Sequence, residues 1–178
     1  MLLAFATCIA FAFAALAQRG IIAMTAHDIE PGHSPRSKPG RSPHGMASAG
    51  HVFAALVRAD PGRVWAALTD PDQTAAYLHG LSAHSAWAPG DPIEFRLGGH
   101  VELTGRVVHV RCRERLSYLL QAGPADPPVY LTWLLRVAPG GCTVRLEIDE
   151  VDAADPSQVA EDVWLPVLAA LQLLVNPA

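Results

Sequence analysis

Residues 57–72 read VRADPGRVWAALTDPD and contain two helix-start signals. Asp60 and Asp70 each precede a proline, so each carboxylate can accept hydrogen bonds from the free amides of a first helical turn. Gln73 stands three residues after Asp70 and completes a capping-box pattern. The stretch therefore predicts two short consecutive helices, the second ending near Leu78. The first helix places three apolar side chains on one side, namely Val64, Trp65 and Leu68.

Strand patterns surround these two helices. Residues 51–58 alternate weakly and predict a first strand. Six further strands are predicted after the helices, at residues 83–87, 92–97, 101–110, 115–120, 129–137 and 142–151. Within residues 92–97, for example, Ile93 and Phe95 share one face while Glu94 and Arg96 take the other. Strands with one apolar and one polar face predict an antiparallel sheet that is covered on one side.

The cover is predicted at the C-terminus. A capping pattern at Asp155 and Pro156 precedes apolar residues at helical spacing, and Pro166 lies inside the same helix. The apolar face consists of Val159, Val163, Trp164, Val167, Leu168, Leu171, Leu174 and Val175. Such a wide apolar face predicts a long helix packed on the sheet.

This order of elements resembles the activator of Hsp90 ATPase homologue-like (AHSA1-type) proteins of the START-like (SRPBCC) superfamily. Further echoes of that family lie at residues 87–91 (WAPGD), 105–108 (GRVV), 115–118 (RLSY), 131–135 (LTWLL), 141–146 (GCTVRL) and 164–168 (WLPVL). The resemblance implies an α+β helix-grip fold with a curved antiparallel sheet of about seven strands, two short helices and a long C-terminal helix. It also implies a cavity between the sheet and that helix.

Composition limits the chain to one folded domain and to few chemistries. The 178 residues are 51% apolar, with a net charge of −4 and a pI near 6.0, which argues against nucleic-acid binding. Residues 46–178 carry 9 Arg, no Lys and 15 acidic residues, so lysine-based catalysis is excluded there. The three cysteines lack a pairing pattern, and we expect Cys112 and Cys142 to be small, reduced packing residues.

The first 45 residues differ from the rest. Residues 1–17 form an apolar, signal-like segment, although no basic residue precedes it, and a Pro/Ser/Gly-rich linker follows. Two interpretations remain open. Either the protein is exported through this segment, or translation starts near Met46 and the protein is cytoplasmic. We expect the second, with a START-like domain at residues 46–178.

Polar residues that face the predicted cavity are few. His109 is in phase with Leu103, Gly105 and Val107, and Tyr118 is in phase with Leu116 and Leu120. These two are the only catalytic candidates, although His109 also fits an exposed strand edge and Tyr118 a core aromatic. No nucleophile-elbow, zinc-protease, phosphate-loop or dinucleotide motif is present. His79 and His84 lack a third ligand, so we expect neither a metal nor a cofactor.

Aromatic side chains are the more informative set. The predicted ligand-pocket residues are Trp65, Tyr77, Trp87, Phe95, Tyr118, Trp133, Trp164 and Leu168. The START-like resemblance implies binding of an apolar small molecule without an assigned reaction. It also allows a polyketide cyclase or aromatase-like enzyme, or an interaction module that docks on an Hsp90-type chaperone. The ligand and the oligomeric state are left open.

Overall fold

The computed structural model describes residues 50–126, 128–150 and 157–176. The predicted leader and linker, the predicted start at Met46 and the predicted cap at Asp155 lie outside the described residues. The elements follow in the order β1 (His51–Val57), α2 (Pro61–Thr69), α3 (Pro71–Tyr77), β2 (Leu81–His84), β3 (Pro92–Leu97), β4 (His100–Arg111), β5 (Arg115–Gln121), β6 (Val129–Ala138), β7 (Gly141–Glu150) and α4 (Ser157–Val175). This is the order of elements predicted from the sequence.

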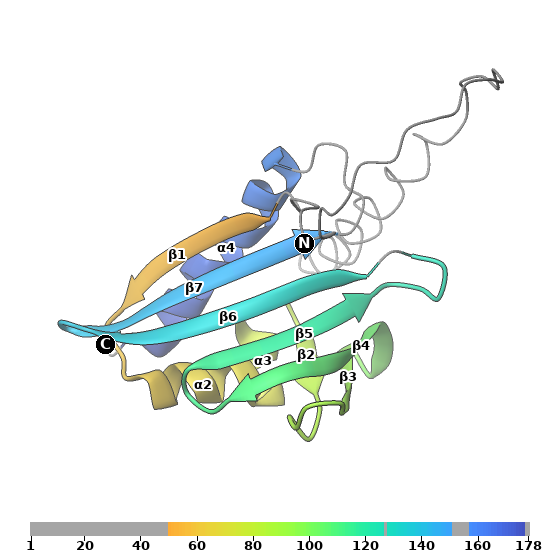
Figure 1. The fold of residues 1–178 in the computed structure, drawn as a ribbon, viewed down its shortest axis with the longest axis horizontal. Coiled ribbons are helices and arrows are strands. Elements are labelled where there is room, and N and C mark those ends of the chain that lie inside the picture. Colours follow the sequence, from red (N-terminus) through yellow and green to blue (C-terminus); the bar gives the residue numbers. More distant parts are fainter. Residues whose placement is uncertain (1–49, 127, 151–156, 177–178) are drawn as a thin grey trace, which may run out of the picture.

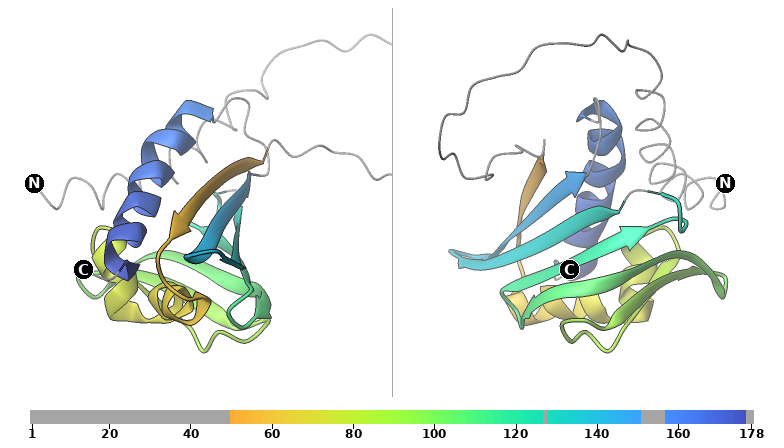
Figure 2. Two further views of the ribbon diagram at one scale, coloured as in Figure 1. Left: turned by 90° about the vertical axis from the view of Figure 1, so that its left-hand side faces the viewer. Right: turned by 45° about the vertical axis from the view of Figure 1, so that its right-hand side comes forward.

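The strands form one antiparallel sheet in the order β1-β7-β6-β5-β4-β3-β2. The first strand therefore pairs with the last, and α2 and α3 carry the chain to the opposite edge of the sheet. Figures 1 and 2 show the sheet curling around one side, on which the described helices lie. Bulges at Phe95/Arg96 and Val107/His109 contribute to this curvature, because a bulge bends its strand. The architecture is the predicted α+β helix-grip fold.

The two aspartates before proline start the short helices as predicted. The Asp60 carboxylate accepts from the amides of Gly62 (2.8 Å) and Arg63 (3.2 Å), and Asp70 caps α3 in the same way. The reciprocal half of the predicted capping box is not formed by Gln73. The Asp70 amide, which such a box needs, instead donates to Ala66 O at the end of α2. One residue thus ends one helix and begins the next.

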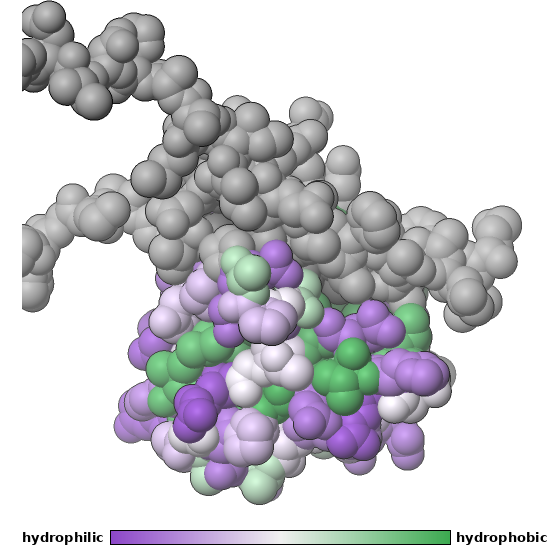
Figure 3. Space-filling model, turned by 90° about the vertical axis from the view of Figure 1, so that its right-hand side faces the viewer, coloured by the Kyte–Doolittle hydropathy of each residue, from purple (hydrophilic) through white to green (hydrophobic). Residues whose placement is uncertain are grey.

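The core lies between α4 and the inner face of the sheet. Within residues 163–175, the helix contributes five buried side chains, Trp164, Val167, Leu168, Leu171 and Val175, and Pro166 is on its exposed side. It lies against β1, α2 and α3, while its buried side chains extend toward the middle strands. Burial of these apolar faces is the main favourable contribution to folding. On the face shown in Figure 3, the hydrophobic residues form separate patches between hydrophilic ones.

Two predictions about where strands end are wrong. The second strand spans Leu81–His84 rather than 83–87, because Trp87 has a φ of 59° and begins the turn that leads to β3. Cys112 is exposed rather than buried, since β4 ends at Arg111 and Cys112 begins the turn to β5. Cys142 is buried and reduced as predicted, and β4 and β7 are not neighbours in the sheet. No helix in the described part of the chain has the length and apolarity needed to cross a membrane.

Candidate functional site

An enclosed apolar hollow lies between the middle strands and the helices. Its walls come from the residue that follows α3, from β2 to β6 and from α4. The lining residues are Leu78, Leu81, Phe95, Leu103, Tyr118, Leu120, Trp133 and Trp164. Its volume is about 20 Å³. A space of this size holds about one water molecule, so the hollow has no room for an organic molecule in this structure.

Tyr118 supplies the polar group of the hollow. Its side chain is 6% exposed, and its hydroxyl accepts a hydrogen bond from Trp133 Nε1 at 3.0 Å. The two residues face the same side of the sheet from neighbouring strands, β5 and β6. A phenol can accept and donate at once, and no described residue accepts the Tyr118 proton. The hydroxyl is therefore a buried donor that can serve a guest molecule.

Two aromatic rings, those of Phe95 and Trp87, lie next to the Tyr118 ring. Phe95 and Trp87 lie with ring centroids 6.1 and 6.5 Å from that of Tyr118, the Trp87 ring being edge-on. The Trp87 indole is fixed because its Nε1 donates to Thr69 O at 2.9 Å. Contacts of this kind favour defined ring positions. The wall around Tyr118 is thus built largely from flat apolar surfaces.

Burial controls the protonation of both inner tyrosines. Desolvation raises the pKa of Tyr118 to about 12, although the hydrogen bond from Trp133 opposes this shift. Desolvation also raises the pKa of Tyr77 well above its ordinary value, with the Tyr118 phenol as a smaller cause. Both phenols are therefore neutral near pH 7. In that state Tyr118 can act as a hydrogen-bond donor but not as a base.

The predicted inward position of His109 is wrong. The bulge between Val107 and His109 shifts the register, so that Val107 pairs with Tyr118 but His109 pairs with Ser117. The extra residue moves His109 to the outer face of the sheet, where its side chain is exposed. The alternative, an exposed residue near the strand end, is the one that the structure supports.

The structure brings half of the predicted pocket residues to the hollow. Phe95, Tyr118, Trp133 and Trp164 line it, whereas Trp65, Tyr77, Trp87 and Leu168 pack around it without lining it. The lining leucines, Leu78, Leu81, Leu103 and Leu120, were not singled out from the sequence. Strand parity marks Leu103 and Leu120 as inward-facing, but it does not separate a cavity wall from the remaining core.

The metal-ligating side chains do not gather. No group of three or more His, Cys, Asp or Glu residues suited to a metal ion occurs within residues 50–126, 128–150 and 157–176. His84 is instead within hydrogen-bond distance of the Ser82 hydroxyl, at 2.9 Å from Nε2. The described residues of the hollow therefore offer apolar contact and one hydroxyl.

Comparison with protein families places the fold. The family model described as activator of Hsp90 ATPase homolog 1-like protein matches residues 58–176. This match spans α2 to the end of α4 and includes every residue that lines the hollow. No curated protein matches the chain.

Several solved bacterial structures share the fold. Protein MLL2253 from Mesorhizobium loti is 23% identical over 70% of this chain and 95% of its own, with a TM-score of 0.60. Protein CV1439 from Chromobacterium violaceum is 22% identical over 72% of this chain and 98% of its own, also with a TM-score of 0.60. DynU16, a protein in the dynemicin biosynthetic locus, is 21% identical over 70% of this chain and 46% of its own, with a TM-score of 0.57.

Proposed function

This chain belongs to the family of activator of Hsp90 ATPase homolog 1-like proteins, and we propose that it binds an apolar small molecule in the hollow beneath α4. The observation that carries the proposal is the hollow itself, an enclosed space with apolar and aromatic walls and one donor hydroxyl. Ligand sites commonly combine a mostly apolar lining with a few placed polar groups.

Binding requires the hollow to open, because about 20 Å³ is far smaller than an organic molecule. The arrangement of α4 supports such opening. The helix lies against β1, α2 and α3, at the rim of the curved sheet, while large side chains such as Trp164 fill the distance to the middle strands. A shift of α4 or a rotation of Trp164 enlarges the hollow without breaking the sheet. We propose that the guest occupies the space thereby created.

The guest should be a flat, neutral molecule with a hydrogen-bond acceptor. Flat surfaces match the rings of Phe95, Tyr118 and Trp133, which border the hollow. A carbonyl or ether oxygen matches the Tyr118 hydroxyl, whose proton no described residue accepts. A charged group is disfavoured, because the described walls contain no ionic partner and burial of an unpaired charge is costly.

We favour binding over catalysis by this site. A cyclase or aromatase-like reaction needs groups that exchange protons with the substrate, and His109 lies on the outer face. The raised pKa of Tyr118 suits a donor that polarises an oxygen rather than a base. No described feature favours docking on a chaperone over ligand binding. For the compartment, a start near Met46 and a cytoplasmic location remain our proposal.

The test is thermal stabilisation of the full-length protein by a panel of lipids, isoprenoids and neutral aromatic ketones. A guest that binds the folded state raises the melting temperature in a concentration-dependent way. Leu103→Phe should abolish this rise, because Leu103 lines the hollow and is 2% exposed. Leu173→Phe is the matched control, since Leu173 lies on the same α4 helix that covers the hollow but is 82% exposed. The absence of stabilisation across the panel would overturn the proposal.

A further inference from the structure

A line of arginines crosses the outer face of the sheet, opposite to α4. Arg111 on β4 is the register partner of Arg115 on β5, and Arg115 is the partner of Leu134 on β6. Arg136 lies two residues beyond Leu134, so it is the diagonal neighbour of Arg115. Arg145 on β7 is the other register partner of Leu134. We refer to Arg111, Arg115, Arg136 and Arg145 as the arginine line; all four are exposed.

Among the described residues, acidic neighbours compensate the two ends of the arginine line and not its centre. Arg111 Nε lies 3.1 Å from a Glu114 carboxylate oxygen, and Arg145 Nε lies 2.8 Å from Glu147. Arg115 instead donates from Nε to the Ser117 hydroxyl at 3.1 Å. Among the described residues, none makes a hydrogen bond or ion pair with the Arg136 side chain. The two central guanidinium groups therefore lack a carboxylate partner in the described part of the chain.

The close spacing of these arginines lowers the stability of the sheet, and the acidic composition of the domain does not explain it. Like charges on register partners destabilise a sheet, as for Arg111 and Arg115. Residues 46–178 contain only 9 basic residues against 15 acidic ones, yet four of the arginines form this line. Uncompensated cations in an acidic domain indicate a site for an anion.

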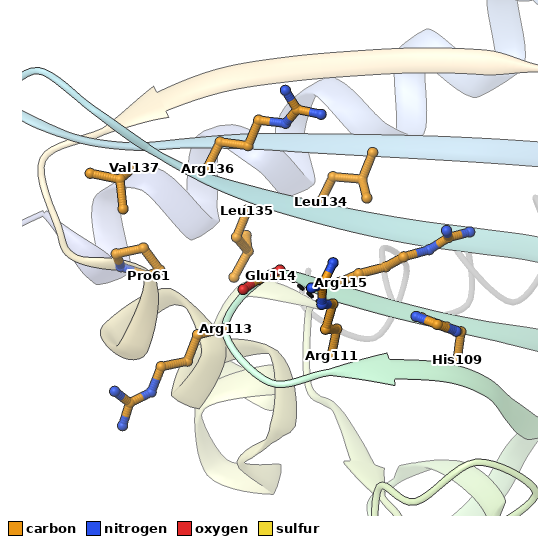
Figure 4. Close-up of a pocket in the computed structure, with 10 residues that line it drawn as sticks. All are labelled: Pro61, His109, Arg111, Arg113, Glu114, Arg115, Leu134, Leu135, Arg136 and Val137. Atoms are coloured by element: carbon orange, nitrogen blue, oxygen red, sulfur yellow. Dashed lines mark ion pairs between the residues drawn. The ribbon is translucent and has the colours of Figure 1, made fainter.

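The arginine line borders a hollow in the surface. An open hollow of about 710 Å³ lies where β6 extends past the start of β5, next to the turn between β4 and β5. Figure 4 shows Arg111, Arg115 and Arg136 on the same side of the sheet, with Leu134 between Arg115 and Arg136. A second hollow of about 480 Å³ shares Leu134 and Arg136 and extends to Arg145. The apolar Leu134 side chain thus lies among Arg115, Arg136 and Arg145, while Glu114 and Glu147, the ion-pair partners of Arg111 and Arg145, also line the two hollows.

From this geometry we propose that the outer face binds a small molecule with two acidic groups, held by Arg115 and Arg136 over Leu134. The guanidinium fork matches the two oxygens of a carboxylate or a phosphate group. Diagonal neighbours in a sheet are about 7–8 Å apart at the backbone, which suits two acidic groups separated by a short apolar body. The Ser117 hydroxyl, which also accepts from Thr132, keeps Arg115 in position.

The size of the patch favours a small ligand over a macromolecule. The arginine line spans three strand spacings, about 14 Å, and the Debye length at physiological ionic strength is about 8 Å. A small dianion fits within the basic patch. A nucleic acid, an anionic membrane or a large acidic protein extends beyond it and meets a domain with 15 acidic residues. The volumes of the two hollows also fall within the range of small-molecule sites.

The test is calorimetric titration of the full-length protein with isophthalate, pyrophosphate and benzoate. We expect saturable binding of isophthalate, pyrophosphate or both, and the better of the two identifies the acidic group. Benzoate, with one carboxylate, should bind at least about tenfold more weakly. Arg136→Gln should weaken binding at least about tenfold, and Arg115→Gln should do the same. Arg106→Gln is the control, because Arg106 lies on the neighbouring strand β4 and donates to Gly90 O outside the hollow.

Several outcomes would overturn the proposal. One is the absence of saturable binding by either dianion. Another is equal weakening by Arg106→Gln and Arg136→Gln, which would indicate a general charge effect. Binding of polyglutamate without binding of the small dianions would instead identify an acidic protein segment as the partner. Leu103→Phe should leave dianion binding unchanged, so this site is tested independently of the hollow beneath α4.

Discussion

Replacement of Tyr118 by phenylalanine tests the inner hydrogen bond that organises the hollow. The change removes the oxygen that accepts from Trp133 Nε1 at 3.0 Å and leaves the ring in place. Trp133 is 1% exposed, so its indole N–H then lacks both its partner and bulk water. A buried donor left unsatisfied in this way costs about 1–3 kcal/mol. We expect Tyr118→Phe to lower the free energy of unfolding in urea by this amount.

The matched control is Tyr130→Phe, since Tyr130 lies on the adjacent β6 strand but is 38% exposed. Its effect should lie within about 0.5 kcal/mol of zero.

A further arm uses alkaline pH. The unfolded chain ionises tyrosine near pH 10, whereas the folded protein keeps Tyr118 neutral up to about pH 12. Stability from this group is therefore complete below pH 10 and is lost between pH 10 and about 12, by up to about 3 kcal/mol. Tyr118→Phe should reduce this loss, and Tyr77 accounts for a remaining part. Equal stability of Tyr118→Phe and Tyr130→Phe at neutral pH would show that the Trp133–Tyr118 hydrogen bond does not stabilise the fold.

Three further sets of substitutions test a helix cap, the close approach of two strands and the burial of the cysteines. Asp60→Ala should lower the unfolding free energy by about 1 kcal/mol, because it removes the α2 cap, and Asp72→Ala should have a smaller effect. Gly105→Ala should cost at least about 2 kcal/mol by urea denaturation, since a Cβ there would lie 1.9 Å from Leu119 O; a neutral result would contradict the close approach of β4 and β5. Cys112→Ser should remove one fast-reacting thiol from the folded protein, whereas Cys142→Ser should leave the fast-reacting count unchanged, because Cys142 is buried and its pKa is raised by desolvation.

The parts of the fold that local chemistry dictates were predictable. Asp60 and Asp70 act as caps because their carboxylates accept hydrogen bonds from the free amides of the first helical turn. This interaction is local, so it does not depend on where the helices pack. Alternation in residues 92–97 predicts the buried and exposed faces of β3 because side chains alternate along a strand. The family resemblance then supplied the helix-grip fold, whereas the long-range pairing of β1 with β7 follows from no local pattern.

The errors arise where one residue changes the register or the strand ends. Parity places His109 inward only if β4 is regular, and the bulge after Val107 reverses the parity. Cys112 follows the last residue of β4, and the alternating pattern does not reveal where the turn begins. The hollow itself depends on how the side chains of β2 to β6 meet α4, which no local pattern encodes. This is why the lining leucines were missed and why the volume of about 20 Å³ was not foreseeable.

The most direct measurement of guest binding beneath α4 is fluorine NMR of protein labelled with 5-fluorotryptophan. The chain has four tryptophans, which Trp→Phe variants can assign individually. Trp133 and Trp164 line the hollow, whereas Trp65 on α2 does not. With a guest that raises the melting temperature, we expect shifts of the Trp133 and Trp164 signals and an unchanged Trp65 signal. A stabilising guest that leaves both Trp133 and Trp164 unshifted would contradict it.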